Sequence, residues 1–343
     1  MALLQREMLA STQQVLLALA AARRVDEVLA EAGVPALFLK GVHLAASVYP
    51  QAGLRPMRDV DVLVPEHAAA RALAALERAG ACREAGKDGD IDAWRAGMHH
   101  LPALVMPGRG VRVEVHTSLS PRAELAALGV HAMPQWQDLW SRAVSIDCAG
   151  RTVRVLSPED LLVHLAVHAV YQHRLSNGPL AIADVGFLLA RHCVDWAALW
   201  RAADHQGVTR GCVLVLKLLE REWGPQPVKW HGRSASVDNG VLESASMLLL
   251  QESQRPGHLA IAKASQGVGG AARLALQRIF MTRRDLALMY PVKASSLAAF
   301  AWYPRHWWRL VTKRLPEYLR YRRQPGVNLD LQAMDAFERW LSG

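Results

Sequence analysis

The sequence predicts an α+β fold, in which a small mixed sheet with its helices is followed by a mainly helical region. The first half alternates short apolar runs with turn residues, whereas apolar residues recur at helical intervals from about residue 157. A chain of 343 residues that is 51% hydrophobic can also bury more than one core. We therefore expect an N-terminal helix at 1–33, a sheet-containing domain at 34–156 and a helical domain at 157–343.

The charge and the cysteines narrow the class of protein. A formal net charge of +9 favours an anionic partner, such as a nucleotide, nucleic acid, phosphopeptide or lipid headgroup, without choosing among them. The four cysteines lack the short paired spacing of zinc, redox or disulfide sites. Residues 15–22 are followed by charged residues instead of a cleavage site, and no apolar run is long enough to cross a bilayer. We expect a cytoplasmic protein with no transmembrane segment.

The chain opens with helical periodicity. Residues 3–32 predict an amphipathic helix that ends at Gly33, and the apolar residues 36–39 then predict a short strand. Lys40 and Gly41 follow that strand directly and lead into a short helix at 42–48. The strand therefore ends where a cation and a glycine stand together.

Three further strands and a helix are expected before residue 117. A loop at 49–58 precedes a strand at 60–64, and a helix runs from Pro65 to Ala79 before Gly80 caps it. A polar segment is expected at 86–98. It is followed by two predicted strands, at 100–106 and 111–116, which a turn containing Pro-Gly joins at 107–110.

Strand periodicity places acidic side chains on one face. Because side chains alternate along a strand, Asp59 and Asp61 point one way and the intervening valines point the other. The same rule places Glu114 with Arg112 and His116 on one face of the later strand. If the two strands are neighbours, three carboxylates converge. Such a cluster resists ionisation unless a divalent cation relieves the repulsion, and Mg²⁺ suits carboxylate and phosphate oxygens.

An ordered set of motifs resembles a known family. The set comprises Leu39-Lys40-Gly41, Tyr49, the run from Gly53 to Val64 that contains Asp59 and Asp61, Glu114-Val115-His116, and Ser157-Pro158-Glu159-Asp160 with His168 and Asp184. It is similar to the signature of the uncharacterised nucleotidyltransferase family of the polymerase-β-like superfamily, over roughly residues 30–195. The resemblance implies a nucleotidyltransferase-like catalytic domain at 34–156. It also implies that His168 and Asp184 brace the helical half against the active site.

The resemblance and the residues together suggest a role for each group. Asp59 and Asp61, with Glu114, would hold one or two Mg²⁺ ions, or Glu114 would deprotonate the acceptor. The superfamily more often has Gly-Ser where this chain has Lys40-Gly41; Gly41 allows close approach of phosphate and Lys40 supplies a charge. Arg55 and Arg58 would add two-pronged contacts to phosphate. His116 would polarise a carboxylate or meet the substrate, or it is a hydrogen-bonded structural histidine.

Duller interpretations stand beside these. The two aspartates can be the solvated face of an edge strand, and the protein can be a non-catalytic binding module for nucleic acid, lipid or a protein partner. As an enzyme, it would move a nucleotidyl or related phosphoryl group from a nucleoside triphosphate such as ATP to a hydroxyl or phosphate. The acceptor is left open among a peptide, a glycan, RNA and a small molecule.

The helical half contains recognisable helix boundaries and, at 302–323, a basic aromatic tail. Helices are expected at 158–173, 179–191, 195–205, 210–222, 240–253 and 270–288, with a loop at 224–238. Ser157 is the expected N-cap of the first helix. His164 and His168 lie one helical turn apart but lack a third zinc ligand, so we interpret them as structural. Residues 302–323 interleave aromatic and basic residues, which is typical of a packed terminal helix or of a site for an anionic partner.

Overall fold

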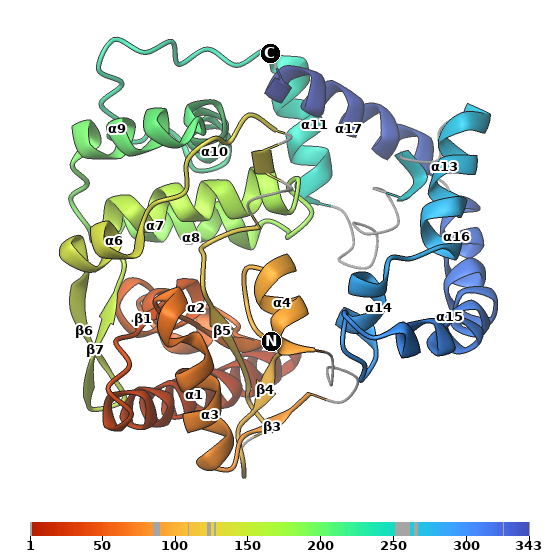
Figure 1. The fold of residues 1–343 in the computed structure, drawn as a ribbon. Helices are drawn as coiled ribbons and strands as arrows, with labels where there is room; N and C mark the ends of the chain where they lie inside the picture. Colours follow the sequence, from red (N-terminus) through yellow and green to blue (C-terminus); the bar gives the residue numbers. More distant parts are fainter. Residues whose placement is uncertain are drawn as a thin grey trace.

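The computed structural model describes residues 2–84, 90–108, 110–121, 125–126, 128–250, 261–263, 267–324 and 326–342 (Figure 1). Parts of the expected 86–98 segment, of the 107–110 turn and of the 240–253 helix lie outside these ranges. Among the described residues, no helix is long and apolar enough to cross a membrane.

A mixed seven-stranded sheet forms the first half of the molecule, in the order β3-β4-β5-β2-β1-β7-β6. The central pairs β2–β5 and β1–β7 are parallel, and the other pairs are antiparallel. This arrangement, with helices following it, confirms the predicted α+β fold. The strands are β1 Leu37–Phe38, β2 Asp59–Leu63, β3 Cys82–Arg83, β4 Leu104–Val105, β5 Arg112–His116, β6 Val144–Cys148 and β7 Arg151–Val155.

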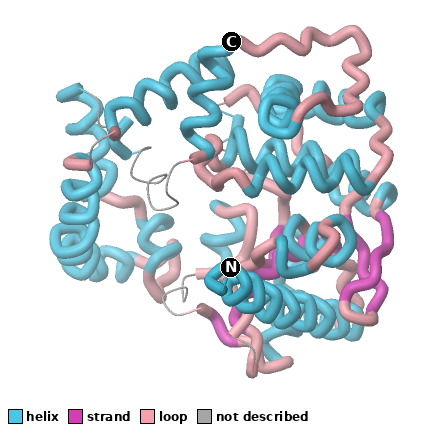
Figure 2. The backbone as a smooth tube through the Cα atoms, turned by 180° about the vertical axis from the view of Figure 1, so that it is seen from behind, coloured by secondary structure: helices cyan, strands magenta, loops and turns pink. Residues whose placement is uncertain are grey.

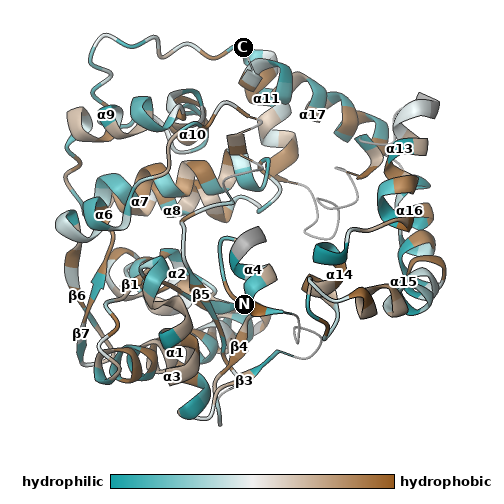
Figure 3. Ribbon diagram, viewed as in Figure 1, coloured by the Kyte–Doolittle hydropathy of each residue, from teal (hydrophilic) through white to brown (hydrophobic). Residues whose placement is uncertain are grey.

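Helices cover both faces of the sheet (Figures 1 and 2). On one face α1 (Ala2–Glu31) and α3 (Ala69–Arg78) pack against the valines of β2 and β5 in one buried cluster. On the other face lie α7 (Pro158–Ala166) and α8 (Leu180–Arg191), whose apolar residues appear in brown in Figure 3. Leu37 and Leu63 of the sheet belong to this second cluster, so one core spans the proposed division at residues 156 and 157.

The remaining helices extend the second half. Ser157 caps α7 by accepting a hydrogen bond from the backbone N–H of Asp160, as expected. The last helix, α17 (Val327–Ser342), packs beside α11 (Asn239–Leu249) (Figure 1). The other helices are α2 Lys40–His43, α4 Ile91–Gly97, α6 Trp136–Arg142, α9 Trp196–Gln206, α10 Thr209–Trp223, α13 Gly267–Ile279, α14 Arg283–Met289, α15 Tyr303–Arg309 and α16 Leu315–Arg322. Short 3₁₀ segments occur at Ala52–Leu54, Glu66–Ala68 and Leu297–Trp302, and π-helical turns at Leu44–Val48, Val167–Gln172 and Leu310–Arg314.

One expectation about the helices was wrong. The expected helix at 270–288 is divided between α13 and α14, because Thr282 and Asp285 form a reciprocal capping box that starts a new helix. The hairpin of β6 and β7 was not predicted. It turns through Ala149 and Gly150, both at positive φ (54° and 79°), and alanine in this conformation gives no turn signal in a sequence.

The buried histidine of α2 makes stability depend on pH. His43 is 1% exposed, and neither ring nitrogen has a hydrogen-bond partner among the residues that the structure describes. Burial, and secondarily the nearby His192, lower the pKa of His43 to about 3. The unfolded chain, whose histidines titrate near pH 6.5, therefore takes up a proton that the folded chain refuses as the pH falls.

We expect His43→Leu to reduce the acid sensitivity of the fold. Between about pH 8 and about pH 5, the loss of unfolding free energy should shrink by about 2 kcal/mol relative to the wild type. Urea unfolding at both pH values measures this difference. The same substitution at the exposed His67, His67→Leu, provides the control for replacing a histidine outside the core. An unchanged pH dependence in His43→Leu would show that His43 is not buried as a neutral ring.

Candidate active site

Three carboxylates lie on the sheet face that α7 covers. Strands β2 and β5 are parallel neighbours, with Asp61 directly opposite Glu114 and Asp59 opposite Arg112. The intervening valines of both strands are buried on the opposite face, against α1 and α3. The expectation that these strands are neighbours is therefore confirmed, and the alternation of side chains along each strand places Asp59, Asp61 and Glu114 on one face of the sheet.

Asp61 is the most enclosed of the three acids. It is 8% exposed, and its oxygens lie 3.2 Å from Lys40 Nζ and 3.1 Å from His116 Nε2. Burial by itself raises the pKa of Asp61, but Lys40 and His116 outweigh burial and hold it well below its usual range. Asp61 in turn raises the pKa of His116 against the effect of burial. His116 therefore donates to Asp61 and orients it.

Glu114 is held from two sides. Arg112 Nη2 lies 2.6 Å from one carboxylate oxygen, and His116 Nε2 lies 3.6 Å from the other. Burial raises the pKa of Glu114. The hydrogen bond from His116 and the nearby His100 outweigh burial and lower this pKa to about 2. Glu114 is therefore ionised across the physiological range, which makes it a weak proton acceptor and a good ligand for a cation.

Asp59 has the opposite environment. No side-chain hydrogen bond or ion pair holds its carboxylate in the described part of the chain. Burial, Asp61 and Glu114 together raise the pKa of Asp59 to about 6. Its charge is thus tolerated poorly beside two ionised neighbours, and a bound cation would relieve the repulsion.

The donor groups suit a divalent ion. Among the described residues, Asp61, Glu114 and His116 offer ligand atoms that all lie within 4.8 Å of one another. The expected set was Asp59, Asp61 and Glu114; two of these belong to the close group, His116 joins them, and Asp59 lies outside it. His164 and His168 do not form such a group with a third ligand in the described residues. Carboxylate oxygens dominate the cluster, as a hard cation requires.

Lys40 and Gly41 begin α2 at the edge of this cluster. Lys40 has a positive φ of 24°, an uncommon conformation for a residue with a side chain. A side chain at Gly41 would come within 3.2 Å of Met57 Cε and 3.3 Å of Arg55 Nη1. Glycine therefore lets the loop before β2 pack closely on the start of α2. This contact is a reason for Gly41 in addition to the expected approach of phosphate.

The two arginines of the loop differ in their contacts. Arg55 makes two hydrogen bonds to Asp184 of α8, from Nε at 3.2 Å and from Nη2 at 3.0 Å, and Tyr49 Oη donates to the same carboxylate at 2.8 Å. Asp184 thereby joins the helical half to the loop, a contact of the bracing kind implied for it. Arg58 is exposed and makes no hydrogen bond or ion pair within the described chain.

Histidines surround the cluster, and sequence reasoning assigned no role to most of them. The rings of His99 and His100 lie 5.3 Å and 5.5 Å from that of His116, between centroids. His168, which was expected as a support, contacts His173 with 3.0 Å between their Nε2 atoms. His99 and His100 lie near the acidic cluster because the backbone of His100 pairs with that of His116. The signal in the sequence was the His99-His100 pair at the start of an expected strand.

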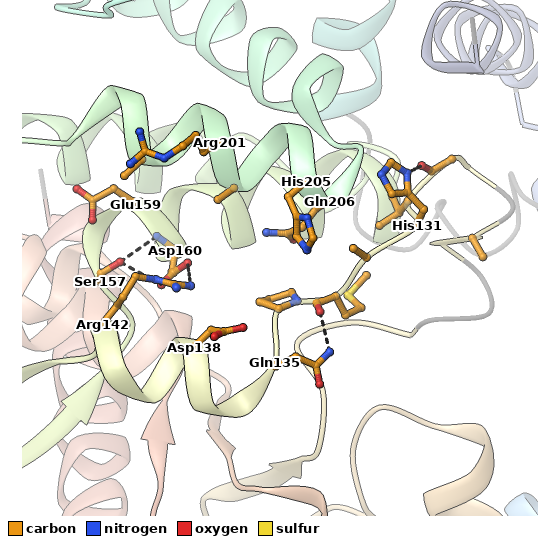
Figure 4. Close-up of a pocket in the computed structure, with 18 residues that line it drawn as sticks. His131, Gln135, Asp138, Arg142, Ser157, Glu159, Asp160, Arg201, His205 and Gln206 are labelled. Carbon is orange, nitrogen blue, oxygen red and sulfur yellow. Dashed lines mark hydrogen bonds and ion pairs between the residues drawn. The ribbon is translucent and has the colours of Figure 1, made fainter.

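A cavity of about 1110 Å³ lies outside the acidic cluster (Figure 4). It is bounded by α6, the start of α7, α9 and the segment 129–135, and an ion pair between Arg142 and Asp160 lies on its wall. Asp160 and Gln206 also line a small void beside His164. None of Asp59, Asp61 and Glu114 lines this cavity, so it is a hollow separate from the three acids.

Comparison with known proteins assigns the chain that bears this acidic cluster to a family. The family described as "Uncharacterised nucleotidyltransferase" matches residues 1–224. The chain belongs to this family. Membership places it among the nucleotidyltransferases, which are enzymes. The matched residues include the acidic cluster, its histidines and the Arg55–Asp184 pair, and the basic aromatic tail lies beyond them.

Two solved structures are similar to this nucleotidyltransferase. One is the solution structure of the antibiotic-resistance factor ANT(2'')-Ia, at 14% identity and a TM-score of 0.40, covering 58% of this chain and 95% of that chain. The other is the crystal structure of an antigenic nucleotidyltransferase-like protein from Paracoccidioides brasiliensis, at 13% identity and a TM-score of 0.36, covering 71% of this chain and 96% of that one. No curated protein matches the sequence.

Proposed function

We propose that the protein transfers a nucleotidyl group from a nucleoside triphosphate to a hydroxyl or phosphate acceptor in the cytoplasm. The observation that supports this most is the pairing of Asp61 with Glu114 across β2 and β5, on the buried face that also bears Asp59. A solvated edge strand would leave such residues exposed, whereas Asp61 is 8% exposed and its strand lies inside the sheet. This enclosure favours a working site over surface charge.

We assign the divalent cation, Mg²⁺ in the first instance, to Asp59, Asp61 and Glu114. Such an ion, when bound, would supply positive charge that offsets the negative charge of the triphosphate during transfer. Asp59 fits a cation site, because burial and the neighbouring carboxylates of Asp61 and Glu114 raise its pKa. His116 would act through Asp61 and Glu114, by keeping both oriented and ionised.

Lys40, Gly41 and Arg58 are our proposed contacts for the polyphosphate. Lys40 Nζ is 3.2 Å from Asp61, which places a point charge at the edge of the acidic cluster. Arg58 directly precedes Asp59 and is exposed, so its guanidinium is accessible to a phosphate oxygen. Arg55 donates both of its hydrogen bonds to Asp184, and we propose that it positions the turn at Gly41. In this proposal, His168 and Asp184 support the helices that face the acidic cluster.

For Glu114, the structure favours ligation over proton abstraction. A general base works best with a pKa near the operating pH, and His116 and His100 lower the pKa of Glu114 to about 2. The acceptor proton therefore leaves to another group or to solvent in our proposal. The acceptor itself, whether a peptide, a glycan, RNA or a small molecule, is not assigned.

Binding of a triphosphate should stabilise the fold only when a divalent cation is present. At a concentration about 100 times the Kd, a nucleotide adds about 2.7 kcal/mol to the unfolding free energy. Thermal unfolding with each of the common triphosphates, with Mg²⁺ or with a chelator, measures this effect. Stabilisation that does not depend on the cation, or none with any nucleotide, would favour the binding-module alternative.

Labelled triphosphates then identify the group that moves. Incubation with cell extract should transfer label from the α-phosphate to an acceptor if a nucleotidyl group moves, and from the γ-phosphate if a phosphoryl group moves. Glu66→Gln, an exposed acid beyond β2, is the matched control and should transfer label as the wild type does. Absence of transfer from either position contradicts the proposed activity.

A further inference from the structure

The positive charge of the chain is concentrated in one segment. Residues 267–324 contain 12 Lys and Arg but two Asp and Glu, a formal charge of +10. The rest of the chain contains 28 basic and 29 acidic residues and has a formal charge of −1. The segment forms α13 to α16, which lie together to one side of the sheet and its helices (Figures 1 and 2). The excess charge therefore belongs to this arm and not to the molecule at large.

The same arm exposes a stripe of large apolar side chains. Trp308, Val311, Leu315 and Leu319 are 72%, 64%, 49% and 45% exposed. Their spacings of three, four and four residues place them on successive turns of the helical run from α15 through Leu310–Arg314 to α16. A helix on a protein surface normally buries such a stripe. Here the apolar face is turned to solvent.

The other side of the run makes the contacts with the fold. His306 and Tyr321 are buried, and His306 Nε2 lies 2.8 Å from the carbonyl oxygen of Arg278 at the end of α13. Trp307 also donates to the carbonyl oxygen of Ile279. The orientation of the helices is thus set by packing on α13, and the outward direction of the stripe is a property of the folded chain.

Basic residues flank the stripe and line a hollow beside it. Arg314 pairs with Glu317, and the other cations of the run have no acidic partner within 4.0 Å in the described chain. A hollow of about 770 Å³ between α14 and α15 is lined by Tyr290, Trp302, Trp308, Arg305, Arg309 and Lys313. Aromatic rings and three cations around one hollow suit a phosphate-bearing headgroup.

We propose that this basic-apolar surface, comprising the stripe with Arg305, Arg309 and Lys313, binds the anionic face of a lipid bilayer. Aliphatic side chains at Val311, Leu315 and Leu319 enter the acyl boundary while the cations contact lipid phosphates. A single-stranded nucleic acid would use the tryptophan but not the aliphatic residues. A second copy would oppose one charge of +10 to another. The surface holds the enzyme against the membrane plane without crossing it.

Vesicle binding tests the proposal on the full chain. The protein should sediment with vesicles of three parts phosphatidylcholine to one part phosphatidylserine, and not with pure phosphatidylcholine. Arg309→Gln with Lys313→Gln should weaken binding about 25-fold, since each surface cation contributes about fivefold. Val311→Asp with Leu315→Asp should weaken it about tenfold or more, and added salt should weaken binding of the wild type.

Leu9→Asp is the matched control. Leu9 on α1 is 71% exposed, close to the value for Trp308, and lies outside the basic-apolar surface. This variant should bind vesicles as the wild type does. Equal sedimentation with both vesicle types, or with neither, overturns the proposal. So does a shift of a single-stranded RNA oligonucleotide in the absence of vesicle binding, or a dimer in sedimentation velocity that Val311→Asp dissociates. Circular dichroism and thermal unfolding confirm that each variant is folded.

Discussion

Asp59→Asn and Asp61→Asn are each expected to lower nucleotidyl transfer by about 10³-fold, equivalent to about 4 kcal/mol of activation free energy. Each substitution keeps the shape of the side chain and removes one negative oxygen from the set that we assign to the cation. Measurement of kcat/KM at saturating Mg²⁺ checks the loss. Cation-dependent stabilisation by the nucleotide should disappear in the same variants.

The two substitutions should change stability in opposite directions. Asp59 is ionised at neutral pH although burial and two acidic neighbours raise its pKa to about 6, so its charge costs folding free energy above that pH. Asp59→Asn should therefore raise the unfolding free energy by about 2 kcal/mol. Asp61→Asn instead leaves Lys40 and His116 without their buried partner and should lower it by about 3 kcal/mol.

This contrast separates chemistry from folding. A stabilised Asp59→Asn that has lost transfer cannot owe that loss to unfolding. If Asp59→Asn retains transfer within about tenfold of the wild type, the carboxylate is not a cation ligand and our assignment is wrong. If both variants are destabilised alike, Asp59 has a positive partner in the folded protein that the proposed site does not include.

Asp184→Ala is expected to lower the unfolding free energy by about 3–5 kcal/mol, the largest stability effect that we anticipate. The substitution leaves the Arg55 guanidinium, whose side chain is 13% exposed, without its carboxylate, and it removes the acceptor of the Tyr49 hydroxyl. A double variant, Arg55→Leu with Asp184→Leu, should recover part of the loss because no buried charge is left unpaired. Urea unfolding of the single and double variants measures the coupling.

The exposed pair of Arg23 and Glu27 provides the comparison, and Glu27→Gln should leave stability nearly unchanged. An Asp184→Ala variant that unfolds with the wild type would show that the pair does not brace the two halves. A rise in the KM for the nucleotide in Arg55→Leu, without loss of stability, would return Arg55 to the phosphate-binding role that the sequence suggested.

The motif-bearing elements were predictable because local rules govern them. Alternation along β2 and β5 assigns Asp59, Asp61 and Glu114 to one face whatever surrounds the strands. The Ser-Pro-Glu-Asp run likewise specifies the start of α7, since capping depends on residues three apart. The prediction of one helix at 270–288 was wrong for a local reason as well. Thr282 and Asp285 form a capping box within this range, and that signal was not recognised.

The sequence by itself determined which residues share a face, where most helices begin, and that the excess charge and aromatic residues lie near the C-terminus. Only the tertiary structure decided what those residues meet. Register between β2 and β5 sets Asp61 against Glu114, and packing of α8 on the loop diverts Arg55 to Asp184. Packing on α13 also turns the stripe at Trp308 to solvent. Periodicity extends over a few residues of one segment, whereas these pairings join segments far apart in the chain.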